Sequence, residues 1–347
     1  MEQQIEQQAN TLLERAALFQ ASDILFMPTN DHYQIYFRKF HQLCHIADYS
    51  SQLATRFIAF FKFEAALDIG DQRRPQSGSF QTMIGSERLA CRVSTLPSAF
   101  SYESLVLRMM YHHAAKSLDD LAVFDSSIAQ LRELPARRQG LVFMTGPTGS
   151  GKSTTLYSLV QQCALAEQKQ VISLEDPVEH PQAHLLQVQV NERAGVSYEV
   201  GLKAILRHSP DVMMIGEIRD KETAKIAIEA ALTGHLVFST IHAKDSLGCI
   251  YRLLDLGISK EDLRQTVIAI IAQRLVPVQD GQQVRALFEI LDEPTIQVVL
   301  EDDKRVFQLP YADTLEGQYE RGLRDGHILC TADLQRLALK AAQQEAT

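Results

Sequence analysis

The sequence predicts an α/β protein with a core built on a buried parallel sheet, preceded by a smaller α+β domain. From Leu141 onward, short runs rich in Val, Ile, Leu and Met alternate with helical patterns, as is typical of a parallel sheet covered on both faces. Residues 1–111 show a different pattern, in which strand-like runs predominate. The chain has 347 residues, enough for two domains of ordinary size.

The N-terminal domain is predicted to span residues 1–111, followed by a polar linker over 112–117. Its expected elements are strands at Ile24–Met27, Tyr33–Phe37 and Ala90–Ser94 and an amphipathic helix over 50–65.

The core domain is predicted to span residues 118–347, with a helical appendage over about 278–347. Leu156, Leu159, Val160 and Cys163 fall on one face of a helix that follows the first core strand. Ser197 can cap a second helix that runs to about His208, and a third covers about Thr223–Leu232. The expected core strands are Leu141–Met144, Val171–Leu174, Val212–Ile215 and Leu236–Ile241.

Composition narrows the class of protein. The five cysteines contain no Cys-x-x-Cys pair, which excludes a tetracysteine zinc site and argues against a disulfide framework. The polar, acidic N-terminus does not resemble a secretory signal, and apolar runs such as Thr266–Ala272 are far shorter than the ~20 residues of a membrane span. A net charge of −9 argues against a surface that coats nucleic acid, although a local basic patch is compatible with it. We therefore expect a cytosolic protein.

A glycine-rich turn after the first core strand fits the pattern G-x-x-x-x-G-K-[ST]. Such glycines let successive N–H groups turn inward around a di- or triphosphate, and the following helix directs its positive end toward it. Lys152 can place a charge on the β- and γ-phosphates, and Ser153 can offer its hydroxyl to Mg²⁺. The predicted nucleotide-binding residues are Gly146, Pro147, Thr148, Gly149, Ser150, Gly151, Lys152, Ser153 and Thr154.

Acidic and histidine residues flank the later core strands. Glu175 and Asp176 directly follow the second strand, with Glu179 close behind, and Glu217 follows the third. A carboxylate at such a strand end can orient the attacking water or hold a metal-bound one. His235 and His242 bracket the fourth strand, and we expect both imidazoles near the same edge. Taken singly, each acid could instead be a helix cap and each histidine a structural hydrogen-bonding residue.

Four ordered motifs resemble the family of secretion ATPases that drives type II secretion and type IV pilus assembly. They lie between about residues 118 and 277 and match the family's Walker A, Asp box, Walker B and His box. In order they read GPTGSGKSTTLYSLV (146–160), ISLEDPVEH (172–180), HSPDVMMIGEIRD (208–220) and TGHLVFSTIHAKDS (233–246). The N-terminal domain resembles the family through Ala21–Ile24, Cys91–Pro97 and Val106–Arg108.

The resemblance implies a RecA-like P-loop core, a PAS-like N-terminal domain and specific residue roles. Glu175 would activate water, and Glu217 would be the Walker B acid that, with Ser153, holds Mg²⁺. His235 and His242 would sense the γ-phosphate. Arg92 and Arg108 would reach it from the smaller domain, although a surface or structural ion pair is the competing interpretation for both arginines.

Two departures from the family pattern stand out. Where members often read Pro-Gln-Asp-Gly-Arg, this chain has Pro75–Ser79, so one arginine is missing at Ser79, and Arg73 or Arg74 is a candidate replacement. No tetracysteine zinc insertion follows the Gln-Arg-Leu segment, so the expected cofactors are ATP and Mg²⁺ without zinc. This compact plan most resembles the competence pseudopilus ATPases of Gram-positive bacteria.

The resemblance further implies a homohexamer on the cytoplasmic face of the cell membrane that works on an inner-membrane platform protein. ATP hydrolysis there would power assembly of a competence (DNA-uptake) pseudopilus or a type II secretion machine. A pilus retraction ATPase and a nucleotide-switched scaffold are the alternatives. A DNA-translocating ATPase is disfavoured, and direct nucleic-acid binding is not expected, because the chain is acidic and lacks basic runs interleaved with aromatic residues.

Overall fold

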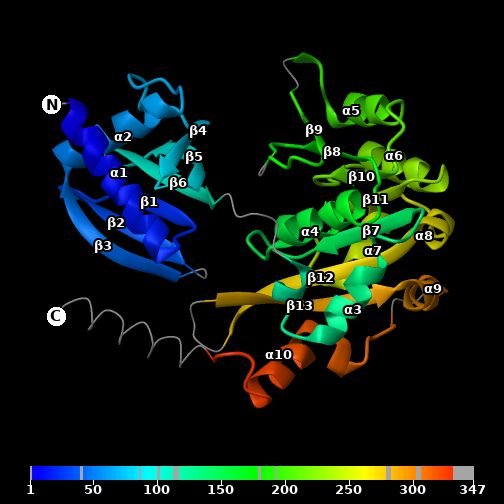
Figure 1. The fold of residues 1–347 in the computed structure, drawn as a ribbon. Helices are drawn as coiled ribbons and strands as arrows, with labels where there is room; N and C mark the ends of the chain where they lie inside the picture. Colours follow the sequence, from blue (N-terminus) through cyan, green and yellow to red (C-terminus); the bar gives the residue numbers. More distant parts are fainter. Residues whose placement is uncertain are drawn as a thin grey trace. The chain divides into compact units, whose positions relative to one another are not determined.

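The structure is a computed structural model in two compact units, residues 1–114 and 115–347 (Figure 1). It describes residues 2–39, 42–85, 87–99, 102–111, 117–178, 181–191, 194–278, 283–301 and 306–330. The expected linker, apart from residue 117, therefore lies outside the described residues, as do Glu179 and the end of the expected appendage, residues 331–347.

The N-terminal unit is a six-stranded antiparallel sheet in the order β3-β2-β1-β6-β5-β4, with two helices packed on one face. Its elements are α1 (Glu2–Phe19), β1 (Asp23–Pro28), β2 (His32–Lys39), β3 (Gln42–Ser50), α2 (Ser51–Glu64), β4 (Gln76–Ile84), β5 (Glu87–Pro97) and β6 (Glu103–Tyr111). The three predicted strands fall within β1, β2 and β5, and the predicted helix is α2.

Helix α1 is an addition to the predicted elements. Its sequence is rich in glutamine but also contains an apolar stripe. The residues of this stripe recur at helical spacing and are all buried: Ile5, Ala9, Leu12, Leu13 and Ala16. These residues join the core between the helices and the sheet. On the other face of the sheet, polar and charged side chains alternate with the buried ones, as expected for a sheet covered on one side only.

The second unit is built on a seven-stranded sheet in the order β13-β12-β7-β11-β10-β8-β9. All neighbouring strands pair in parallel except β12 and β13, which are antiparallel. Its strands are β7 (Gly140–Thr145), β8 (Val171–Glu175), β9 (Leu186–Gln189), β10 (Val212–Ile215), β11 (Leu236–Ile241), β12 (Val267–Val278) and β13 (Gln283–Asp292). The four predicted core strands are confirmed as β7, β8, β10 and β11, so the chain has an α/β fold with a mixed, mainly parallel sheet.

Helices cover both faces of this sheet (Figure 1). The helices are α3 (Asp125–Glu133), α4 (Lys152–Leu165), α5 (Tyr198–Ile205), α6 (Lys221–Leu232), α7 (Ser246–Asp255), α8 (Lys260–Thr266), α9 (Glu293–Glu301) and α10 (Leu315–Arg324), with 3-10 turns at Leu118–Asp120 and Tyr311–Asp313. Side chains of β7 alternate between the two faces: Leu141 and Phe143 pack with α5 to α9, whereas Val142 and Met144 pack with α3 and α4. Burial on both sides explains why these strands read as continuous apolar runs.

The segment expected as a helical appendage contributes a strand to the main sheet. Residues of β13 pair with β12 along its whole length, from Ala269 opposite Asp292 to Val278 opposite Gln283. Helices α9 and α10 account for the helical part. The strand is hard to predict because the charged residues Arg285 and Glu289 interrupt the apolar residues of Gln283–Asp292.

Candidate functional site

The glycine-rich loop joins the carboxyl end of β7 to the amino terminus of α4. Gly146 and Gly151 have φ values of 139° and 85°, which L side chains rarely adopt. A Cβ on Gly146 would lie 2.6 Å from the carbonyl oxygen of Gln273, and one on Gly151 would lie 2.8 Å from the amide nitrogen of the Gln273 side chain. Glycine is therefore required at both positions, and the loop leads directly into the amino terminus of α4, whose positive end favours an anion.

Polar groups of the loop suit a polyphosphate. The Lys152 ammonium donates to the carbonyl oxygens of Gly146 (2.8 Å) and Pro147 (2.9 Å), which holds a positive charge within the loop. Ser150 is buried, and its hydroxyl oxygen finds no hydrogen-bond partner among the described residues. A glycine cradle that a Cβ would fill and an orphaned buried hydroxyl together fit a phosphate group. Ser153 lies half-buried in the first turn of α4.

The strand order brings the other predicted groups to the edge of the sheet where this loop lies. β7, β11, β10 and β8 are consecutive in the sheet (Figure 1). Their carboxyl ends carry, in that order, the phosphate loop, His242, Glu217 and Glu175. Ligands of parallel sheets bind at this edge. The sequence places these residues up to about a hundred positions apart, and only the sheet order makes them neighbours.

Glu217 is bound by an arginine and a histidine. One carboxylate oxygen accepts from Arg219 Nε (2.9 Å) and Nη2 (2.8 Å), and the other lies 3.0 Å from His242 Nε2. The Glu217 side chain is 17% exposed, whereas those of Arg219 and His242 are more than half exposed. The hydrogen bond that Arg219 donates to Glu217 raises the pKa of Arg219 further above its usual range. The Glu217 carboxylate therefore lies between the Arg219 guanidinium and the His242 imidazole.

Glu175 is buried instead, with an exposed fraction of 4%. Its Oε1 accepts from the Ser173 hydroxyl (2.6 Å) and from Gln187 Nε2 (3.0 Å), and its Oε2 accepts from the Tyr157 hydroxyl. Three donors thus satisfy a carboxylate whose burial would otherwise be unfavourable. Asp176, the next residue, is exposed.

Tyr198 lies close to these acids. Its hydroxyl oxygen would be 3.2 Å from a Cβ added to Gly216, which separates β10 from Glu217. Burial raises the pKa of Tyr198 to about 12, with smaller contributions from the charges of Asp176, Glu217 and Glu175, while Arg219 lowers it. The phenol is therefore protonated at neutral pH and can only donate or accept hydrogen bonds there.

The structure corrects the expected position of His235. This residue precedes β11, and its carbonyl accepts from the N–H of Gly140, the first residue of β7. It therefore lies at the amino end of the strands, and the six residues of β11 separate it by about 20 Å from His242. Its Nδ1 lies 3.0 Å from the Ala230 carbonyl, so His235 closes the end of α6. The expectation that both histidines lie near one edge is wrong, because a parallel strand separates its two ends across the sheet.

In the N-terminal unit, the strand register lines up arginines across the face opposite the helices. Arg92 pairs directly with Arg108, Arg108 with Asp23, and Asp23 with Arg38. Arg108 Nε donates to Asp23 Oδ1 (3.0 Å), and Ser22 donates to the other oxygen (2.9 Å). Arg38 Nε is buried and has no partner among the described residues. Like charges directly opposite one another are unfavourable, so this row of three arginines and one aspartate favours an anion.

Ser79 continues this row, since it pairs with Arg92 on the far side. The two candidate replacements for the missing arginine, Arg73 and Arg74, lie in the exposed segment before β4 and occupy no register position of the row. Arg74 approaches Asp71 at 3.7 Å. Within this unit, Arg38 is the further arginine that the register adds.

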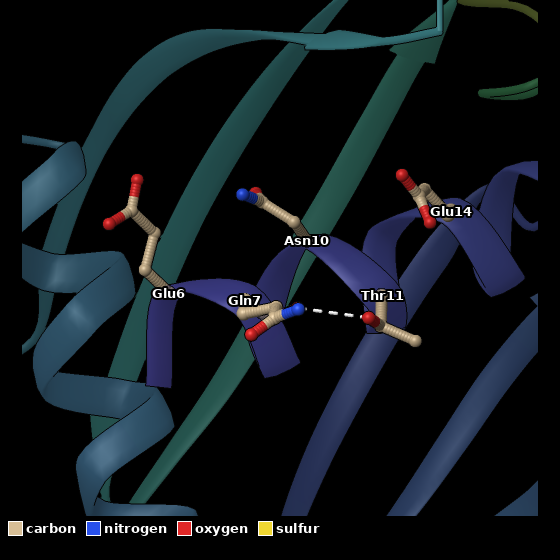
Figure 2. A pocket seen from close by; sticks show the side chains of 5 residues that line it. All are labelled: Glu6, Gln7, Asn10, Thr11 and Glu14. Atoms are coloured by element: carbon tan, nitrogen blue, oxygen red, sulfur yellow. Dashed lines mark hydrogen bonds between the residues drawn. The ribbon is translucent and has the colours of Figure 1, made fainter. Parts of the chain in front are cut away.

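Neither of two surface hollows has the character of a phosphate site. Figure 2 shows a polar one over α1, lined from a single helix by Glu6, Gln7, Asn10, Thr11 and Glu14, with two carboxylates. The other is apolar and lies between α5 and the edge strand β9. Within the described residues, no group of three or more His, Cys, Asp or Glu side chains could hold a metal ion by itself.

Several residues of these clusters escaped the sequence-based prediction. Ser173 and Glu175 are two apart on one strand, which signals a shared face, but the other contacts depend on strand order and register. The missed residues are Asp23, Arg38, Tyr157, Ser173, Gln187, Tyr198 and Arg219.

A glycine loop between a central parallel strand and a helix amino terminus, with acids on neighbouring strand ends, defines a P-loop nucleotide-binding protein. The sequence profile of the type II/IV secretion system proteins matches residues 1–309, and the chain belongs to that family. It is an ATPase of the class that serves secretion and pilus systems.

Known relatives agree with this assignment. The chain is 48% identical over 272 residues to competence protein ComGA of Bacillus subtilis, covering 78% of this chain and 76% of that protein. It is 41% identical over 268 residues to type II secretion system protein E of Klebsiella pneumoniae, covering 77% of this chain and 54% of that protein. The crystal structure of the pilus retraction motor PilT with bound ADP is similar with a TM-score of 0.66 at 25% identity, covering 94% of this chain and 96% of PilT. In the described part of the chain, no helix combines the length and apolar character that crossing a membrane requires.

Proposed function

We propose that residues 146–154 bind the triphosphate of ATP and that the neighbouring strand ends carry out its hydrolysis. The single observation that carries this proposal is the row of carboxyl strand ends that places the glycine loop, His242, Glu217 and Glu175 on one edge of the sheet. The loop N–H groups and Lys152 would neutralise the β- and γ-phosphates. ADP bound to PilT, a structural relative of this fold, supports a nucleotide as the ligand.

In the proposed reaction, water attacks the γ-phosphorus and the bond from that phosphorus to the β–γ bridging oxygen breaks. Glu175 accepts the proton of the attacking water, and ADP and inorganic phosphate leave. His242, which already contacts Glu217, would donate a hydrogen bond to the γ-phosphate and so distinguish ATP from ADP.

Mg²⁺ fits the donor set next to the loop, where the Ser153 hydroxyl and the Glu217 carboxylate, the latter partly through water, are the residues that would hold it. The ion, when bound, neutralises charge on the phosphates. Glu217 now pairs with Arg219 and His242, so its role as a ligand requires it to exchange one of these partners.

Arg92 and Arg108 are proposed to supply guanidinium groups to the charge that develops on the transferring phosphoryl group. Their direct opposition in the register supports this role, because an anion relieves the repulsion between them.

We further propose domain boundaries at 1–111 for a PAS-like N-terminal domain, 112–117 for a linker and 118–347 for a RecA-like core.

For the protein as a whole, we propose a homohexamer at the cytoplasmic face of the cell membrane that acts on a platform protein of that membrane. Its hydrolysis cycle would power assembly of a competence pseudopilus or a type II secretion machine. The similarity to a competence protein over 78% of the chain supports the competence assignment.

The catalytic test uses two variants and matched controls. Lys152→Ala should abolish hydrolysis and leave the fold intact, because the loop lies outside the cores. Glu175→Gln should bind ATP and hydrolyse it very slowly. Lys203→Ala and Glu199→Gln, which alter an exposed pair on α5, should behave like the wild type. Normal turnover by Lys152→Ala would refute the nucleotide site. A wild-type rate for Glu175→Gln would move the water-activating role to Asp176 or Glu179.

The likeness to the retraction motor PilT favours a second candidate, a pilus retraction ATPase. Deleting the gene separates the two, since loss of an assembly motor removes the pilus and loss of a retraction motor gives hyperpiliated cells. A nucleotide-switched scaffold would instead show little stimulation of turnover by the membrane platform protein.

A further inference from the structure

We propose that Tyr157, Ser173 and Gln187 are positioning residues that hold the Glu175 carboxylate in the single orientation that hydrolysis requires. This inference rests on the proposed role of Glu175 as the group that accepts the proton from water. None of these three side chains has been given a role in nucleotide binding or hydrolysis above.

The geometry of the carboxylate supports this assignment. An ionised carboxylate has about four acceptor positions, two on each oxygen. Ser173 (2.6 Å) and Gln187 (3.0 Å) use both positions on Oε1, and Tyr157 uses one on Oε2. Among the described residues, the remaining position on Oε2 is the one left to accept from a water molecule. The three donors therefore determine which oxygen acts as the base.

Each donor comes from a rigid element. Tyr157 is 2% exposed and lies on α4, the helix whose amino terminus begins at Lys152. Ser173 is fully buried on β8, and Gln187 lies on the neighbouring strand β9. A catalytic group supported by helix and strand positions keeps its geometry better than one on a loop. The Tyr157 bond also joins the carboxylate to the helix that would bind the phosphates.

Packing alone does not account for these residue types. A phenylalanine at position 157 would fill the same volume in the core beneath α4. The hydroxyl adds a charge-assisted bond to Glu175, and such a bond fixes a buried carboxylate more strongly than a neutral contact does. The same holds for Ser173, where alanine would suit a strand position buried in the sheet.

The test measures steady-state hydrolysis by the full-length protein with ATP and Mg²⁺. Tyr157→Phe should lower kcat by about tenfold or more, because it removes a hydrogen bond to a charged group, and should leave KM for ATP within about twofold. Ser173→Ala and Gln187→Leu should show the same split between kcat and KM. The matched control is Tyr33→Phe, which removes another buried phenol hydroxyl, bonded to the Glu103 carbonyl (3.0 Å), and should leave kcat unchanged.

A double variant separates positioning from a structural role. In the Glu175→Gln background, measured in long single-turnover experiments, Tyr157→Phe should cause less than a twofold further loss, because residues that act through one group are not additive. An equal loss in both backgrounds, a wild-type kcat for Tyr157→Phe, or a loss that appears only in KM would overturn the proposal. A wild-type rate for Glu175→Gln would instead overturn the proposed function itself, so the two failures are distinguishable.

Discussion

The buried ion pair of the N-terminal unit offers a quantitative test of the structure. Lys62 on α2 and Glu103 at the start of β6 are only 1% and 4% exposed. The ammonium donates to both carboxylate oxygens at 3.0 Å and to the Asp71 carbonyl at 2.9 Å. Lys62→Met keeps most of the side-chain volume but leaves the Glu103 carboxylate without its cation. Removing one partner of a buried pair costs about 3–5 kcal/mol.

Hydrogen exchange measured by mass spectrometry can localise this loss to α2 and β6. Because each 1.36 kcal/mol corresponds to a factor of ten, the amides of these elements should exchange about two to four orders of magnitude faster. Lys203→Met, which breaks the exposed pair with Glu199 on α5, should change exchange there by about twofold at most. The double variant Lys62→Met with Glu103→Leu should recover most of the loss, since an apolar replacement leaves no uncompensated charge. Acceleration of less than tenfold in Lys62→Met would refute the desolvated pair.

Three further predictions concern the second unit and the cysteines. Gly151→Ala should abolish ATP binding in calorimetry, because its φ of 85° and the contact with Gln273 both oppose a Cβ. At Gly195 φ is similar, 79°, but no atom of the described residues lies within 4 Å of an added Cβ, so Gly195→Ala should bind ATP normally. Glu289→Leu should lower the free energy of unfolding, measured by urea titration, by about 2–4 kcal/mol. The reason is that the buried Glu289 carboxylate accepts hydrogen bonds from backbone N–H groups at the amino termini of α7 and α10. An unchanged urea midpoint would contradict this prediction. Burial raises the pKa of Cys91 and Cys163 to about 12 and also raises the pKa of Cys249. These thiols therefore stay protonated at pH 8 and should resist a disulfide reagent until the protein is denatured. Rapid reaction of more than two thiols in the native protein would disprove this prediction.

The structure shows one of the two interpretations of Arg108 that the sequence left open, the ion pair, and leaves its role toward a phosphate as a prediction. Arg108 does form an ion pair with Asp23, yet its side chain remains 51% exposed. One nitrogen is engaged, and the planar guanidinium carries further N–H groups that an anion can accept from. The ion pair with Asp23 is therefore compatible with the proposed role of Arg108 toward a phosphate.

Local chemistry carries most of what the sequence predicts correctly. The loop over 146–153 can be predicted because its glycines, its lysine and its serine lie within eight consecutive residues. The strands β7, β8, β10 and β11 can be predicted because a strand buried on both faces has a continuous run of apolar residues. Such signals depend on neighbours a few residues apart, so no tertiary information is needed to find them.

The failures share one cause, the pairing of distant segments. β13 pairs along β12, and charged residues at positions 285 and 289 interrupt the apolar pattern of its own sequence. His235 and His242 belong to the same motif, but the extended strand between them puts the two imidazoles at opposite edges of the sheet.

By itself, therefore, the sequence determined the α/β class, the phosphate-binding loop and the acids that follow the core strands. Only the tertiary structure decided which of these groups meet: Glu217 with Arg219 and His242, Glu175 with its three donors, and Arg92 beside Arg108. Strand order and register bring together side chains that lie far apart along the chain. Those pairings depend on how whole elements pack, which no local pattern of residues records.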